Sequence, residues 1–368
     1  MNSLDDLRNR INEVDREILR LLSKRVELAR KIGELKKMKG IPIVDYEREL
    51  EVLARGRKLA EELGLDKELV ELALRAIIGI CRKAQSPLKV AFLGPRGSFS
   101  EEAAVKAFLA EGADFYPMPS IRDIFRAAES GDADYGIVPV ENSLEGGVGE
   151  TLDLLAETPL KVCGEVEIRI SLSLIARPGL KIRDIKLVLS HPHALGQCRE
   201  FITKVLRNVK VEACSSTAEA VRKAVKLNGA AAIGSKAAAN FYGGAVLASE
   251  IQDVKDNFTR FFVLGRKKIE RVQGRKTSVI FRLPHTPGSL HEALEPFALR
   301  RINLTRIESR PVKGKPWEYV FHVDFEGDGE KDPRCAQALE ELKEKTSFLK
   351  VLGCYGEVAG TASPSVEK

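Results

Sequence analysis

The sequence predicts a multidomain protein of three parts: an all-α segment, an α/β segment of two lobes, and an α+β segment with the ferredoxin-like order βαββαβ. With 368 residues, the chain is too long for one ordinary domain. Apolar residues recur at three- and four-residue steps in the N-terminal part, whereas short apolar runs alternate with helical stretches further on. We therefore expect domains at residues 1–87, 88–266 and 276–357, followed by a tail at 358–368.

Composition and charge exclude several functional classes. The chain has 59 basic and 53 acidic residues, a formal net charge of +6, and no block of like charges that could follow a nucleic-acid backbone. No apolar run approaches the length needed to cross a membrane. The six cysteines form no CxxC pair and no zinc-like spacing with the five histidines. We expect a cytoplasmic protein without metal or organic cofactor, nucleic-acid partner or membrane anchor.

The first segment predicts three helices. An apolar seam with heptad-like spacing predicts one unusually long helix over residues 4–38, which needs partners to cover the seam. Two shorter helices are expected over residues 45–63 and 67–85, each with an aspartate as its candidate N-cap.

One cation in the long helix points to an anion site. Arg25 occupies a seam position where an apolar side chain is expected, and a buried cation requires an anion. Lys36, eleven residues further, falls on the same helical face. Polar side chains also cluster at helical spacing on the two shorter helices, at Asp45, Arg48, Glu49, Cys81 and Gln85.

This segment resembles the all-helical chorismate mutases through LRNRI, LLSKRVELARKIGELK, DYERE and IIGICRKAQ, in the same order. The resemblance implies the rearrangement of chorismate, which needs a held substrate and hydrogen-bond donors but no nucleophile or metal. It implies that Arg8, Arg25 and Arg48 bind the substrate carboxylates, with Arg8 supplied by a partner subunit. By the same resemblance Lys36 and Gln85 donate to the ether oxygen, and Asp45 and Glu49 position the ring hydroxyl. Cys81 departs from the small polar residue expected in this site; the alternative is a helical dimerisation module with solvated charges.

The central segment has an α/β pattern. The strand-like runs KVAFLG, YGIVPV and KLVLS each precede a helical stretch. An extended run over 162–179 and a return near 245–258 predict two crossings between lobes, with a cleft between them, as in periplasmic-type binding folds. Polar clusters follow these strands, where open α/β sheets bind ligands: GPRGSFS, ENSLEGG, SHPHALGQC and DNFTRFF.

Together these clusters resemble prephenate dehydratase, most specifically in ENS, in SHP with a following QC, and in Asp-Asn-Phe-Thr-Arg-Phe. The resemblance implies that Thr259 is the catalytic hydroxyl, next to Arg260, and we expect Arg260 to set the local field. It further implies a substrate site lined by Glu141, Asn142, Ser190, Gln197 and Phe261. His191 and His193 are alternative acids, because histidine titrates near neutrality.

The last segment resembles the ACT regulatory domain attached to prephenate dehydratases, through PGSLHEAL and the following Glu-Ser-Arg-Pro. The resemblance implies that phenylalanine binds between two such domains and inhibits the enzyme. The implied allosteric residues are Gly288, Ser289, Leu290, Glu308, Ser309, Arg310 and Pro311. The alternative is a domain that only dimerises.

The leading hypothesis is a cofactor-free enzyme that rearranges chorismate to prephenate and then decarboxylates and dehydrates prephenate to phenylpyruvate. Because the long helix and the sensor each need a partner, we expect a homodimer or higher homo-oligomer. Two other hypotheses remain. One is a two-lobed receptor for an aromatic acid, and the other is a dehydratase whose helical segment only dimerises or whose substrate is arogenate.

Overall fold

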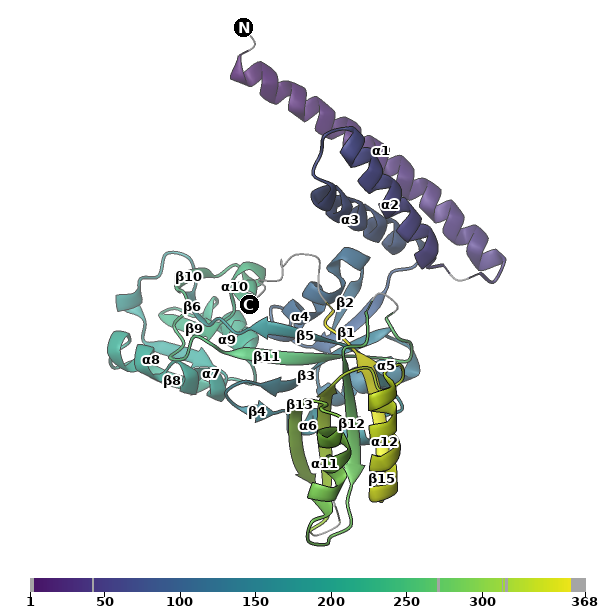
Figure 1. Cartoon of the computed structure of the whole chain (residues 1–368). Coiled ribbons are helices and arrows are strands. Elements are labelled where there is room, and N and C mark those ends of the chain that lie inside the picture. Colours follow the sequence, from purple (N-terminus) through teal and green to yellow (C-terminus); the bar gives the residue numbers. More distant parts are fainter. Residues whose placement is uncertain (1–2, 42, 270–271, 313, 315–316, 359–368) are drawn as a thin grey trace. The chain divides into compact units, whose positions relative to one another are not determined.

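The computed structural model describes residues 3–41, 43–269, 272–312, 314 and 317–358, and the chain divides into two compact units (Figure 1). The first unit contains Met1–Lys89 and Ala107–Asp114, and the second contains Val90–Lys106 and Phe115–Ala359. Apart from Val358, the tail expected at 358–368 lies outside the described residues. None of the described helices is long and apolar enough to span a bilayer.

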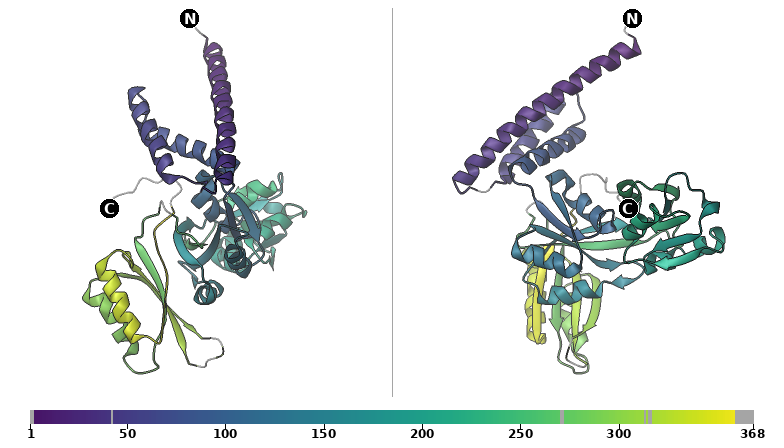
Figure 2. Two further views of the ribbon diagram at one scale, coloured as in Figure 1. Left: turned by 90° about the vertical axis from the view of Figure 1, so that its right-hand side faces the viewer. Right: turned by 180° about the vertical axis from the view of Figure 1, so that it is seen from behind.

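The first unit is helical, as the sequence predicts. Its elements are α1 (Leu4–Met38), α2 (Tyr46–Glu62), α3 (Lys67–Gln85) and the short 3-10 helix η1 (Leu109–Glu111). Each long helix begins at a side-chain cap: Ser3 and Asp6 form a capping box on α1, and Asp45 and Asp66 cap the other two. The N-terminal part of α1 extends past α2 and α3 (Figure 2), so much of its apolar seam is exposed.

The first lobe of the second unit is a six-stranded sheet in the order β2-β1-β3-β11-β5, with β4 paired to β3. Its strands are β1 (Lys89–Leu93), β2 (Asp114–Met118), β3 (Tyr135–Asn142), β4 (Gly146–Gly147), β5 (Lys161–Arg169) and β11 (Phe258–Gly265). Its helices are α4 (Phe99–Phe108), α5 (Ile121–Ser130) and α6 (Gly149–Glu157). Strand β11 returns from the second lobe and lies antiparallel between β3 and β5.

The second lobe is a five-stranded sheet in the order β10-β6-β9-β7-β8. Its elements are β6 (Ser173–Ala176), η2 (Ile182–Asp184), β7 (Leu187–Ser190), α7 (Pro192–Gln197), α8 (Arg199–Val205), β8 (Lys210–Ala213), α9 (Thr217–Ala224), β9 (Ala230–Gly234), α10 (Lys236–Tyr242) and β10 (Ala245–Ala248). The two crossings between the lobes lie side by side, because the Ile170 amide donates to the Asn257 carbonyl over 2.7 Å.

The C-terminal part of the second unit runs β12 (Lys276–Arg282), α11 (Ser289–Leu299), β13 (Leu304–Pro311), β14 (Tyr319–Glu326), α12 (Pro333–Lys345) and β15 (Phe348–Tyr355). Its sheet order is β13-β14-β12-β15. Both helices pack on one face of this sheet around Phe281, Phe297 and Phe325. The other face joins the core of the first lobe, where Ile280 and Tyr355 pack with residues of β3 and β11.

Candidate active site

Thr259 lies near the start of β11, opposite Asn142 at the end of β3. The Asn142 Nδ2 donates to the Thr259 Oγ1 over 2.9 Å. The Asn142 Oδ1 accepts from the backbone amides of Leu144 and Glu145, at 3.0 and 3.1 Å. These two backbone donors fix which end of the Asn142 amide faces Thr259, since only its oxygen can accept from them.

The second lobe reaches this pair through two further amide side chains. Asn257, which is fully buried, accepts from the Asn142 Nδ2 over 2.8 Å and donates to the Gln197 Oε1 over 3.0 Å. Gln197 in turn donates to the Glu145 carboxylate over 3.3 Å. The structure thus brings three expected residues, Thr259, Asn142 and Gln197, into one hydrogen-bond network. Asn257 and Glu145 were not expected in the site. Asn257 lies in the DNFTRFF cluster and Glu145 in the ENSLEGG cluster, and their places in these motifs could have indicated them.

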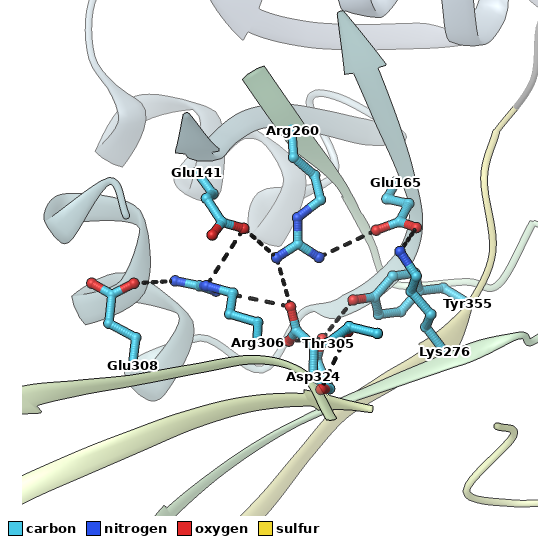
Figure 3. A network of polar contacts seen from close by, with 10 residues as sticks. Glu141, Glu165, Arg260, Lys276, Thr305, Arg306, Glu308, Asp324 and Tyr355 are labelled. Carbon is cyan, nitrogen blue, oxygen red and sulfur yellow. Dashed lines mark hydrogen bonds and ion pairs between the residues drawn. The ribbon is translucent and has the colours of Figure 1, made fainter. Parts of the chain in front are cut away.

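Arg260 points to the other side of β11, because successive side chains alternate across a strand. Its guanidinium donates to Glu141 at 2.8 Å, to Glu165 at 3.3 Å and to Asp324 of β14 at 2.7 Å (Figure 3). Burial acts to lower the pKa of Arg260, but Asp324 and the neighbouring acids raise it above its ordinary value. The contacts of Arg260 therefore tie β11 to the C-terminal domain, and its expected effect on the field at Thr259 stays a prediction.

The Arg260 network continues into the C-terminal domain. Asp324, only 2% exposed, also accepts from the Ser278 hydroxyl at 2.5 Å, and Ser278 lies 2.6 Å from the Tyr355 hydroxyl. Burial and then Asp324 raise the pKa of Tyr355 well above its ordinary value. Lys276 donates to Glu165 over 2.7 Å (Figure 3). Glu141, expected at the substrate site, belongs to this same network.

Other residues expected at the dehydratase site have different surroundings. Ser190 is fully buried and donates to the Ile233 carbonyl over 2.7 Å, so its hydroxyl joins β7 to β9 instead of lining a cleft. Phe261 is 2% exposed and contributes to the core. His191 caps α7, and burial followed by His193 lowers its pKa, which disfavours the protonated acid form. Among the described residues, no cluster of His, Cys, Asp or Glu could hold a metal ion.

In the helical unit, Arg25 points from α1 toward α3. Its Nη1 lies 2.7 Å from the Sγ of Cys81, which is buried. Lys36 donates to the Ile43 carbonyl over 3.0 Å and lies 3.6 Å from Asp45. At Gly33, α1 comes close to Gln85 at the end of α3. A side chain at this position would be crowded, because its Cβ would lie 3.0 Å from the Gln85 Cβ.

Glu49 is held by Arg82, a residue that was not expected in the site. Arg82 also donates to Glu111 of η1 over 2.5 Å, and its guanidinium stacks on the Tyr46 ring. Burial acts to lower the pKa of Arg82, but Glu49 and Glu111 raise it overall. The remaining two arginines expected here make only local contacts on exposed helix faces, Arg8 with Asp5 and Arg48 with Glu51.

The expected allosteric residues lie in two places. Gly288, with φ +85°, precedes α11, which begins with Ser289 and Leu290. On β13, Glu308 accepts from Arg306 over 2.6 Å, and Arg310 lies 3.3 Å from Asp153 of α6. Glu308, which also lies beside Gly147, and Arg310 face the first lobe, whereas Ser309 and Pro311 are exposed on this edge strand.

Family models match each part of the chain in turn. Chorismate mutase type II matches residues 7–86, prephenate dehydratase matches 90–269, and the ACT domain matches 277–344. These matches define the class of protein, an enzyme that joins a mutase, a dehydratase and a regulatory domain in one chain.

Whole-chain similarity gives the family. The chain is 43% identical to the bifunctional chorismate mutase/prephenate dehydratase of Aquifex aeolicus, over 96% of this chain and 98% of that one. It belongs to the bifunctional chorismate mutase/prephenate dehydratase family, and has the isomerase and lyase activities of that family.

Two other relatives each cover 75% of this chain. Arogenate dehydratase 2 of Petunia hybrida is 42% identical, over 75% of this chain and 74% of that one. The solved structure of prephenate dehydratase from Arthrobacter aurescens in complex with L-Phe is 35% identical, with a TM-score of 0.68, and covers 75% of this chain and 92% of that chain.

Proposed function

We propose that Thr259, Asn142 and Gln197 form the dehydratase site, with Thr259 donating to the departing hydroxyl of prephenate. The reaction releases carbon dioxide and the ring hydroxyl together, and aromatisation drives it, so the main task is to stabilise the leaving oxygen. One observation carries the proposal: Thr259 accepts a hydrogen bond from Asn142, so its own proton can be directed at the substrate. Accepting that bond also makes the hydroxyl a stronger donor.

Replacing Thr259 with alanine tests this role. We expect Thr259→Ala to lower dehydratase turnover by roughly 10², a typical loss when one donor to a developing oxyanion is removed. Thr259→Ser keeps the hydroxyl and is the matched control, so it should retain most of the turnover. Urea unfolding of the same preparation reports that the second unit has folded, because the mutase residues lie in the other unit. Near-normal dehydratase turnover in Thr259→Ala would exclude the proposed role.

For the mutase, we propose that Arg25, Lys36 and Gln85 bind and orient chorismate within one helical unit. Arg25 and Lys36 are cations partly withdrawn from solvent, and each is held in place by a neighbouring polar atom. Their charges suit the two carboxylates and the ether oxygen at which negative charge builds during rearrangement. Asp45 and Arg48 at the start of α2 would complete the site.

We propose that a second copy of the chain covers the long helix and supplies Arg8. Ile11 and Ile18 on the seam of α1 are 61% and 55% exposed, and adjoining apolar residues are exposed as well. An apolar stripe of this length is typical of a helix that packs against a partner. Ile18→Lys should shift the sedimentation coefficient toward the monomer and lower mutase activity by roughly tenfold or more, because each site would lose the Arg8 of its partner. A dimer that persists with full activity would argue against this assembly.

We propose that phenylalanine binds the ACT domain and inhibits the enzyme, with Gly288 and the exposed Ser309 as contacts. The L-Phe complex of the Arthrobacter relative supports this choice of effector. Inhibition requires that phenylalanine bind one conformation better than another. The Arg260 network gives the ACT domain a direct contact with the catalytic strand, so a shift of β14 would reach β11.

The whole proposal is tested by giving the full chain chorismate, without metal, and following phenylpyruvate with and without phenylalanine. Phenylpyruvate that appears, and decreases when phenylalanine is added, is the expected result. Accumulation of prephenate would exclude the dehydratase assignment, and unchanged chorismate would exclude the mutase assignment. Because one plant relative is named an arogenate dehydratase, arogenate should be assayed beside prephenate. We propose prephenate as the preferred substrate. We also propose a cytoplasmic location, which is consistent with six buried cysteines that form no disulfide bond.

A further inference from the structure

Four residues beside Thr259 form a closed ring of hydrogen bonds in the described part of the second unit. The Glu145 backbone amide donates to Asn142, Asn142 donates to Asn257, and Asn257 donates to Gln197. Gln197 then donates to the Glu145 carboxylate, which closes the ring. Glu145 is therefore both the first donor and the last acceptor.

The direction of every bond in this ring is fixed at both ends. A backbone amide can only donate, so the Asn142 oxygen must face it and the Asn142 nitrogen must face Asn257. An ionised carboxylate can only accept, so the Gln197 nitrogen must face Glu145. Asn257 satisfies both requirements only with its oxygen toward Asn142 and its nitrogen toward Gln197. No amide in the ring can flip alone without placing two donors or two acceptors together.

This direction decides what the Thr259 hydroxyl does. The Asn142 Nδ2 has two hydrogens, and its acceptors at 2.8 and 2.9 Å are Asn257 and Thr259. The Phe258 carbonyl also accepts from this nitrogen, at the longer distance of 3.1 Å, and accepts from the Ser143 amide as well. If Asn142 were reversed, its oxygen would accept the Thr259 proton and the hydroxyl could no longer donate to a substrate. The ring therefore keeps Thr259 an acceptor toward Asn142 and leaves its proton free to be donated to a substrate.

Asn257 occupies the key place in the ring. It is fully buried, and its backbone carbonyl accepts from Ile170 where the two crossings between the lobes lie side by side. Its side chain joins Asn142 of the first lobe to Gln197 of the second on one side of the ring, and Glu145 joins the same two residues on the other side. We propose that Asn257 is a positioning residue of the dehydratase. Through Asn142 it fixes the direction in which the Thr259 hydroxyl donates, and through Gln197 it couples this direction to the position of the second lobe.

A purely structural alternative exists, because buried amides are normally hydrogen-bonded whatever their role. The two interpretations differ for Asn257→Asp, which keeps the shape and replaces the amide donor with a carboxyl group. When ionised, the introduced carboxylate would turn the Gln197 amide around and set its oxygen against the Glu145 carboxylate. When protonated, the introduced carboxyl would donate to Gln197 as asparagine does, and burial should raise its pKa into an accessible range.

The test is a double-mutant cycle on the full chain, with dehydratase kcat and KM measured from about pH 5.5 to 8.5, the range in which a buried carboxyl with a raised pKa titrates. Asn257→Asp alone should lower kcat by roughly 10² at high pH, with a smaller effect on KM, and should regain activity as pH falls. In an E145Q background the reversed Gln197 meets an amide donor in place of a carboxylate. The N257D loss should then be smaller by roughly tenfold or more, and its pH dependence should flatten. E145Q alone is the reference for the second arm of the cycle.

Equal, pH-independent losses in the two backgrounds, or no loss in N257D, would overturn the proposal. Should N257D fold poorly, Q197E tests the same contact between positions 197 and 145 at a less buried residue. E145Q should restore activity to this variant too. Urea unfolding of each preparation reports folding of the second unit, which carries all of these substitutions. The inference rests on the proposed role of Thr259, but the two fail separately. Normal turnover in Thr259→Ala excludes the Thr259 hydroxyl as the donor. A double-mutant cycle that shows no coupling between positions 257 and 145 excludes the positioning role of the ring.

Discussion

Thr259 and Arg260 are neighbours in sequence, yet they belong to different networks. Thr259 contacts Asn142 at the junction of the two lobes, and Arg260 contacts Asp324 in the ACT domain. The alternation of side chains along β11 produces this division, because consecutive residues face opposite sides of the sheet. A short motif can therefore contain both the hydroxyl proposed for catalysis and a contact to the ACT domain.

Arg82 shows how a single residue can stabilise the helical unit. Its guanidinium pairs with Glu49 and Glu111, and all three side chains are less than a quarter exposed. Arg82→Gln would leave two partly buried carboxylates without their cation, and we expect a loss of about 2 kcal/mol in the stability of this unit. The temperature of half-inactivation of the mutase should fall accordingly. Lys31→Gln, which breaks an exposed pair with Glu27, is the control and should change it little.

The sequence located most of these residues but could not assign their contacts. The resemblance pointed to Thr259, Asn142 and Gln197, which the structure joins in one hydrogen-bond network. The resemblance could not show that the Ser190 hydroxyl donates to the Ile233 carbonyl, because that hydrogen bond joins two strands that meet only on folding. Nor could it show that Arg260 meets Asp324, which lies in another domain. Such partners depend on register and strand order, which one sequence does not encode locally.

At the scale of elements, prediction succeeded where periodicity is strong. The seam of α1 and the aspartate caps of α2 and α3 specify these helices from local sequence alone. Strand β13 was harder. Glu308 and Arg310 were expected to bind an effector, but they face the first lobe because its Asp153 and the neighbouring Arg306 supply opposite charges. An edge strand offers two faces, and the choice between them depends on tertiary packing.

Strand β14 should make the ACT domain sensitive to acid. His322 is 3% exposed, and burial, followed by Arg306, lowers its pKa from 6.5 to about 4. The unfolded chain therefore binds a proton that the folded strand resists. The free energy of unfolding is therefore unaffected by this group above about pH 6.5. It decreases as pH falls from 6.5 toward 4, by ~3 kcal/mol in total. Urea unfolding of the wild type and His322→Gln should differ in its pH dependence over this window; parallel curves would contradict the assignment.

At the scale of the whole molecule, a buried ion pair is among the contacts that join the ACT domain to the first lobe of the second unit. The ACT sheet packs its open face on the first lobe, and Asp324 places a carboxylate against Arg260 of the catalytic strand. A buried ion pair has a small net effect on stability but a strict geometry, which makes it suited to selecting one arrangement of two packed parts. Phenylalanine would act by favouring an arrangement in which this contact is altered.

Removing the charge of Asp324 should weaken feedback more than catalysis. Asp324→Asn keeps the size of the side chain, and Arg260 retains Glu141 and Glu165 as partners, so basal turnover should stay within about threefold. The phenylalanine concentration for half-inhibition should rise roughly tenfold, the effect of ~1.4 kcal/mol of lost coupling. Calorimetry should still detect phenylalanine binding, which separates lost coupling from a lost site. Glu330→Gln breaks an exposed pair with Lys268 in the same unit and is the matched control. Unchanged inhibition in Asp324→Asn would mean that the regulatory signal reaches the catalytic lobe by another contact.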